Sequence, residues 1–261
     1  MSPLLRAACL LATIALPIAV SGAPGARLPA YVARAAADPA RKGQVADDAR
    51  RHGPEIVAFA GLRPGGKVLD LIPGAAYWTR LFARTVGPRG HVYGVWPKAY
   101  ADEAHQNVVD YEALGHTADF ANVSGSVQPT DRLTVPERVD LVFTAQNYHD
   151  YPDAFMGKLD PSVFNKAAFA ALKPGGVLLI VDHVAQAGSG MRDTDTLHRI
   201  DPAIVRKQVV AAGFRFVGES RLLANPADDH SKAVFDKTIR GHTDQFIYKF
   251  VKPLHQAPVR R

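Results

Sequence analysis

Short apolar runs alternate with longer amphipathic runs along most of this chain. Apolar runs rich in Val, Ile and Leu are typical of strands that are buried on both faces of a sheet. The amphipathic runs carry apolar residues three and four positions apart, which is the spacing of one helical face. The pattern predicts strands at residues 67–72, 91–96, 139–145 and 177–185, and helices at 45–62, 76–86, 99–114, 161–173 and 201–214.

The order of these elements predicts an α/β protein. Strands that alternate with helices form βαβ units, and these build a parallel sheet with helices on both faces. A weaker strand is expected within 119–128. The last two apolar stretches, 214–224 and 246–253, have only loop between them and are expected to form an antiparallel edge pair. We therefore predict a doubly wound sheet of about seven strands, mostly parallel.

Residues 1–23 differ in kind from the rest of the chain. Arg6 precedes an apolar stretch that ends in small residues at Ala23. This pattern predicts a secretory signal peptide, and hence an exported, periplasmic protein with no membrane contact after cleavage; an uncleaved anchor is the alternative. Cys9 is the only cysteine, so the mature chain is expected to have no thiol. We divide the remainder into an N-terminal arm, a single domain and a tail, at residues 24–44, 45–253 and 254–261.

The chain is basic, with a net charge of +6 and an isoelectric point near 9.5. Its Lys and Arg residues are scattered singly or in pairs, and they form no clustered basic run. Nucleic-acid-binding surfaces concentrate their positive charge. We therefore expect a solvated basic surface and no nucleic-acid partner; the sequence gives no indication of oligomeric state.

Several segments, in order, resemble those of class I S-adenosylmethionine-dependent methyltransferases. VLDLIPGAA stands where the family has its cofactor loop, GHVYGVW resembles the second strand, VDLVFTAQNYHD the fourth, and LKPGGVLLIVDH leads into the fifth. Together with TLHRIDP and RGHTDQF, they resemble more narrowly a group of bacterial exported methyltransferases. The resemblance covers residues 45–253 and implies a Rossmann-like fold, the cofactor S-adenosylmethionine and a small-molecule substrate.

The cofactor loop departs from the family pattern. The three glycines of that pattern fall on Ile72, Gly74 and Ala76, so only the central one is kept. The Pro73-Gly74 turn and two small alanines still allow a ligand to approach the backbone closely. The family's acid at the end of the second strand, which accepts from the ribose hydroxyls, is replaced by Trp96; Asp102 or Glu103 is an alternative acceptor. The resemblance implies that the cofactor is bound by Asp70, Pro73, Gly74, Ala75, Ala76, Tyr77, Trp96 and Asn147.

Polar residues follow the fourth and fifth strands, where the resemblance places the substrate. His149 is the candidate general base because the pKa of histidine lies near neutral pH, and Asp150 is expected to orient it. Tyr148, His198 and Arg199 are the candidate substrate contacts.

A metal-assisted mechanism is an alternative. Asp182 and His183 follow the fifth strand, but Ala145 stands where metal-dependent O-methyltransferases carry their first ligand. His149 or Asp150, together with Asp182, is an alternative set of oxygen and nitrogen ligands, but we assign no metal ligands. The predicted function is methyl transfer from S-adenosylmethionine to a small molecule. The competing hypothesis is an exported methyltransferase-fold protein that has lost the cofactor and serves as a binding or scaffold module.

Overall fold

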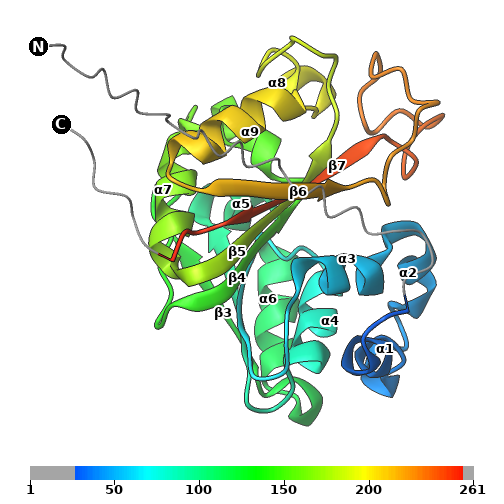
Figure 1. The fold of residues 1–261 in the computed structure, drawn as a ribbon, viewed down its shortest axis with the longest axis vertical. Helices are drawn as coiled ribbons and strands as arrows, with labels where there is room; N and C mark the ends of the chain where they lie inside the picture. The colour runs from blue at the N-terminus through cyan, green and yellow to red at the C-terminus, as the bar shows by residue number, and fades with distance from the viewer. Residues whose placement is uncertain (1–26, 255–261) are drawn as a thin grey trace, which may run out of the picture.

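The computed structural model describes residues 27–254, which form one seven-stranded sheet with helices on both faces (Figure 1). The strand order is β3-β2-β1-β4-β5-β7-β6. Strands β1 to β5 pair in parallel, and β7 lies antiparallel between β5 and β6. The predicted fold class is therefore confirmed, including the antiparallel C-terminal pair. The strands are β1 (Lys67–Leu71), β2 (His91–Pro97), β3 (Val123–Gln128), β4 (Val139–Ala145), β5 (Leu172–His183), β6 (Arg215–Ser220) and β7 (Gln245–Val251).

Two helical layers cover the sheet. One layer contains α1 (Ala30–Ala36), α3 (Gly53–Ala60), α4 (Tyr77–Val86) and α6 (His105–Gly115). The other contains α7 (Pro161–Ala171) and α9 (Pro202–Ala211), which pack against each other and against β4 to β7. The central strands are buried on both faces by these layers, which explains their continuous apolar sequences. The short elements are α2 (Val45–Arg51), α5 (Lys98–Glu103), α8 (Thr194–Leu197), η1 (Pro39–Arg41), η2 (Ala118–Phe120), η3 (Tyr148–Asp150) and η4 (Ala154–Met156).

Two predicted helices are each broken in two. The predicted helix 45–62 divides at His52, whose left-handed backbone (φ 49°) separates α2 from α3. Pro54 lies in the first turn of α3, where its missing N–H is tolerated. Gly53 is required at this bend, because a Cβ there would lie 2.1 Å from the hydroxyl oxygen of Tyr77. The predicted helix 99–114 divides at Ala104 into α5 and α6.

The described part of the predicted N-terminal arm belongs to the packed domain. Helix α1 packs on α4 and buries Val32 and Ala35. Arg41 is fully buried and pairs with Asp48 at 2.7 Å. The predicted boundary at residue 45 is therefore too late. The predicted signal peptide and residues 255–261 of the predicted tail lie outside the described residues. Within residues 27–254, no helix is both long and apolar enough to span a bilayer.

Candidate functional site

The carboxyl ends of the parallel strands place four segments at one edge of the sheet. The loop 72–76 follows β1, α5 follows β2, η3 follows β4, and the chain after β5 leads to α8. The neighbours of β1 are β2 and β4, so the strand order reverses at β1. Open α/β sheets bind their ligands at such a switch point, outside the carboxyl ends of the strands.

The loop 72–76 keeps a left-handed backbone at each position where the methyltransferase pattern has glycine. The φ angles are 52° at Ile72, 55° at Gly74 and 61° at Ala76. Glycine adopts this conformation freely, whereas a residue with a Cβ is strained there, and a β-branched residue is the most strained. Such strain persists only where the surroundings impose it, and it clusters at functional sites. The loop therefore has backbone angles that favour glycine at all three positions, although only one of them is glycine.

The tip of this loop is open to a ligand. Gly74 is half-buried, Ala75 is exposed, and a Cβ added at Gly74 would meet no atom within 4 Å. Ala76 is the N-cap of α4 and makes no side-chain cap, so no side chain satisfies the first N–H groups of this helix. Backbone N–H groups at a helix start favour anionic or electron-rich ligand atoms.

Asp70 lies beneath the loop, in the core. Its side chain is buried and accepts a hydrogen bond from Thr79 Oγ1 at 2.6 Å. Burial raises the pKa of Asp70 to about 7, against the hydrogen bond from Thr79. The predicted contact of Asp70 with the cofactor is corrected, because its side chain is buried and instead links β1 to Thr79 of α4.

Tyr77 is a second predicted cofactor contact that the structure uses elsewhere. Its hydroxyl donates to Asp48 at 2.6 Å, and the guanidinium of Arg51 lies 4.9 Å from its ring centroid. The side chain is buried. Tyr77 therefore joins α4 to α2.

Trp96 is fully buried, which corrects its predicted place beside the ribose. Its ring packs edge-on against Tyr111 of α6, with ring centroids 4.7 Å apart. Room for Tyr111 comes from Gly94, where a Cβ would lie 2.4 Å from the tyrosine ring. The alternative acceptor Asp102 is exposed and pairs with Lys98 at 2.7 Å. Neither Trp96 nor Asp102 thus presents an acceptor at the switch point beside β1.

Tyr100 links the segments that follow β2 and β4. It extends from α5, after β2, and its hydroxyl donates to Asp150 in η3, after β4. The same hydroxyl accepts from Asn147 Nδ2 at 3.3 Å. The other side-chain atom of Asn147, Oδ1, is buried without a hydrogen-bond partner. The bridge therefore closes the switch point over β1 and leaves one unsatisfied acceptor beside it.

His149 lies between two carboxylates. Its Nδ1 is 2.7 Å from Asp182 Oδ1, and its Nε2 is 3.1 Å from Asp150 Oδ1. The backbone N–H of His149 also donates to Asp182 Oδ2 at 2.9 Å. Burial alone would lower the pKa of His149, but the two carboxylates outweigh burial and raise it to about 10. This environment corrects the predicted role of His149: an imidazolium that donates both of its protons is not a general base at neutral pH.

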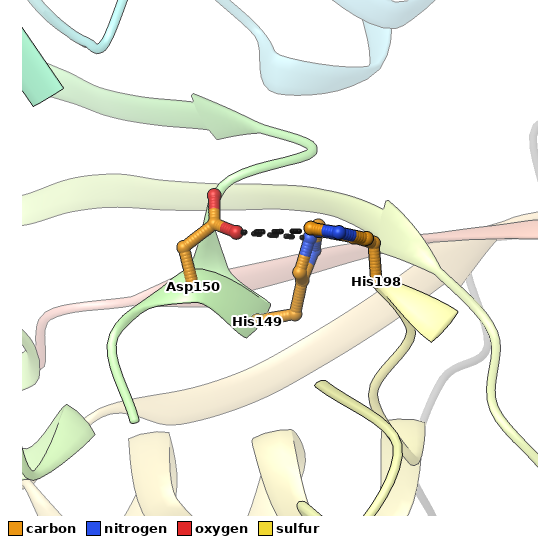
Figure 2. Close-up of side chains that lie close together, drawn as sticks. All are labelled: His149, Asp150 and His198. Carbon is orange, nitrogen blue, oxygen red and sulfur yellow. Dashed lines mark ion pairs between the residues drawn. The ribbon is translucent and has the colours of Figure 1, made fainter. Parts of the chain in front are cut away.

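His198 completes a cluster with His149 and Asp150. Its Nδ1 lies 3.9 Å from Asp150 Oδ1, and its ring is 5.6 Å from that of His149, centroid to centroid. Figure 2 shows the two imidazoles and the carboxylate pointing toward one another. His198 ends α8 with a left-handed backbone (φ 53°), and its side chain is 31% exposed, so the cluster touches solvent through this residue.

The other two predicted substrate contacts are structural. Arg199 is fully buried, pairs with Asp228 at 2.9 Å, and donates to the carbonyls of Val184 and Lys232. Tyr148 is also fully buried, and its hydroxyl accepts from Asn165 Nδ2 at 2.8 Å. Both predictions are corrected, because a side chain enclosed on all sides by its own chain has no face for a substrate.

Sequence reasoning missed two members of the site. Tyr100 carried no signal beyond its place after the second strand. Asp182 was weighed only as a metal ligand, although in the structure it accepts from the side chain and the backbone of His149. His183, its neighbour, is hydrogen-bonded to Thr243 at 2.8 Å, and burial lowers its pKa to about 4.

The chain is similar in sequence to known C-methyltransferases. It is 27% identical over 193 residues to the ubiquinone/menaquinone biosynthesis C-methyltransferase UbiE of Vibrio cholerae, a match that covers 71% of this chain and 62% of the relative. It is 30% identical over 138 residues to UbiE of Hydrogenovibrio crunogenus, which covers 51% of this chain and 47% of the relative. The chain therefore spans less than two thirds of these relatives. No family model matches it.

Solved structures share the fold. A S-adenosylmethionine-dependent methyltransferase from Aquifex aeolicus superposes with a TM-score of 0.55 at 18% identity, over 81% of this chain and 96% of that one. The [4+2]-cyclase SpnF superposes with a TM-score of 0.60 at 15% identity, over 79% and 82%. A cyclase on the same fold shows that the fold alone does not fix the reaction. The chain thus has the Rossmann-like fold of S-adenosylmethionine-dependent methyltransferases.

Proposed function

We propose that the protein is a S-adenosylmethionine-dependent methyltransferase that acts on a small molecule. The observation that carries the proposal is the loop after β1, which keeps left-handed φ angles at Ile72, Gly74 and Ala76. Two of these residues, Ile72 and Ala76, are strained by that shape, and backbone strain of this kind clusters at functional sites. The similarity to C-methyltransferases supports the same reaction class.

The residues at the switch point fit part of the cofactor. The open loop tip and the uncapped start of α4 would receive its amino-acid portion, and Asn147 Oδ1 is a buried acceptor in need of a donor. The carboxylate that usually accepts from the ribose hydroxyls is absent, because Trp96 stands in its place and is enclosed in the core. The Tyr100 bridge joins α5 to η3 at this switch point, so a cofactor that enters there must displace it.

When bound, S-adenosylmethionine supplies a methyl group on a positively charged sulfur. The acceptor attacks the methyl carbon in line with the carbon–sulfur bond, and the sulfur is the leaving group. The contribution of this chain is to hold the acceptor in line with the methyl group, and such positioning accounts for much of the rate in reactions of this type. His149 is held as an imidazolium, which places a fixed positive charge between Asp150 and Asp182. It therefore stabilises the polar edge of the site and accepts no proton.

A second candidate function is a binding module that no longer uses the cofactor. Two observations favour it: the buried Trp96 at the ribose position and the Tyr100 bridge between α5 and η3. Export to the periplasm, which we propose from the leader-like sequence of residues 1–23, also favours it. Under either function the scattered basic residues support a small-molecule partner and no nucleic acid.

A matched pair of glycine variants tests the proposal. Gly74 and Gly65 both have positive φ, and a Cβ would meet no atom within 4 Å at either. Alanine at each is therefore expected to cost a similar strain of about 1 kcal/mol. We expect Gly74→Ala to weaken binding of S-adenosylhomocysteine in equilibrium dialysis, and Gly65→Ala, in the turn that precedes β1, to leave it unchanged. Equal affinity in both variants, or no binding by the unaltered chain at millimolar ligand, would contradict the proposal.

A further inference from the structure

We infer that His149, Asp150 and His198 form a binding site for a divalent first-row transition metal, with Asp182 as the outer partner of His149. The three ligand atoms are His149 Nε2, Asp150 Oδ1 and His198 Nδ1, and all lie within 4.8 Å of one another. The inference is independent of S-adenosylmethionine binding.

The spacing of the ligand atoms suits a metal at their centre. Metal–nitrogen and metal–oxygen bonds of about 2.0–2.2 Å in tetrahedral geometry place neighbouring ligand atoms about 3.3–3.6 Å apart. The carboxylate oxygen Asp150 Oδ1 is 3.1 Å from His149 Nε2 and 3.9 Å from His198 Nδ1. A small movement of the partly exposed His198 ring closes the longer distance, while the two buried ligands stay in place (Figure 2).

The partners behind the ligands match those of known metal sites. A metal-bound histidine usually donates its other ring N–H to a carboxylate, which fixes the tautomer and the ring orientation. Here His149 Nδ1 lies 2.7 Å from Asp182 Oδ1, so Nε2 is the atom directed at Asp150. The second oxygen of Asp150 accepts from Tyr100, which leaves Oδ1 for the metal. Both inner ligands are therefore oriented before a metal arrives.

The ligand types select the metal. Two imidazole nitrogens and one carboxylate oxygen suit Zn²⁺, Fe²⁺ and related ions, whereas Mg²⁺ and Ca²⁺ prefer oxygen ligands only. The metal takes the place of the proton between His149 Nε2 and Asp150 Oδ1, and that proton leaves to solvent. With three protein ligands and His198 at the surface, at least one coordination position faces solvent, as in catalytic metal sites.

Metal titration of the full chain, after treatment with a chelator, tests this inference. We expect one Zn²⁺ per chain by calorimetry, and Co²⁺ to produce the visible absorption of a nitrogen- and oxygen-ligated ion. His198→Ala should weaken Zn²⁺ binding by at least about 100-fold, because loss of an outer partner alone costs 10–100-fold. His198 is partly exposed, so this variant is expected to fold; Asp150→Asn should weaken binding as well.

His116→Ala is the matched control, because His116 is exposed, lies at the end of α6, and makes no side-chain hydrogen bond among the described residues. We expect it to bind Zn²⁺ as the unaltered chain does. The inference would be overturned if His198→Ala kept its affinity within a factor of about two, or if His116→Ala lost as much. Failure of the unaltered chain to bind Zn²⁺ would overturn it too, and would leave the result with S-adenosylhomocysteine unaffected.

Discussion

Replacement of Arg199 by methionine distinguishes a structural role from a substrate contact. The change leaves Asp228, which is buried, without its cationic partner and deprives the carbonyls of Val184 and Lys232 of a donor. Removal of one member of a buried ion pair costs about 3–5 kcal/mol. Asp228 keeps two backbone N–H donors, from His230 and Asp244, so we expect a loss near the lower end, about 3 kcal/mol.

Urea unfolding followed by circular dichroism measures this loss. The control is Arg50→Met, because the side chains of Arg50 and its partner Asp47 are both exposed; its unfolding midpoint should not change. A double variant, Arg199→Met with Asp228→Leu, should recover part of the stability, since no unpaired charge remains. An Arg199→Met protein as stable as the Arg50→Met protein would refute the structural role and return Arg199 to the substrate site.

Three further changes probe the core and the switch point. Asp70 has its pKa raised from 3.8 to about 7, so the folded state holds a proton that the unfolded state releases, and stability should fall as pH rises from about 4 to about 7. The decline in the free energy of unfolding is about 4 kcal/mol, at about 1.4 kcal/mol per pKa unit, and Asp70→Asn should remove it. Denaturant unfolding at several pH values across this range measures the effect. A variant with the same pH profile as the unaltered chain would contradict the burial of an ionisable Asp70. Gly94→Ala should lower the free energy of unfolding by about 1–3 kcal/mol, because its Cβ would lie 2.4 Å from the ring of Tyr111; a variant of unchanged stability would argue against this packing. Tyr100→Phe removes the donor to Asp150, and hydrogen exchange in α5 should become faster while exchange in β4 stays slow; unchanged exchange in α5 would mean that the bridge does not hold the helix.

The sequence predicted the sheet well, because a strand that is buried on both faces has a recognisable run of apolar residues. Runs such as VLLIV (177–181) are apolar throughout because both faces of β5 are covered, and two apolar stretches with only loop between them, 214–224 and 246–253, correctly indicated an antiparallel pair. The helix breaks at His52 and Ala104 were missed. At His52 the break coincides with the local Gly53-Pro54 pair, because proline lacks the N–H that would continue the preceding helix.

The site was predicted less well, because the environment of a side chain depends on the fold. The sequence predicts that His149 is a general base. In the structure Asp182, which is 33 residues away in the chain, raises the pKa of His149 and favours its cationic form. Arg199 and Trp96 are residue types that often contact ligands, but only the structure shows that both are enclosed. The loop was the reverse case: its glycine pattern is mostly lost, while its backbone shape is kept.

Isothermal titration calorimetry of the full chain with S-adenosylmethionine and S-adenosylhomocysteine tests the central claim most directly. The account predicts binding of one cofactor molecule per chain, with affinity weakened by Gly74→Ala. No heat of binding for either compound at millimolar concentration, from a chain shown to be folded by circular dichroism, would contradict the proposed methyltransferase activity and leave the binding module as the function that the structure supports.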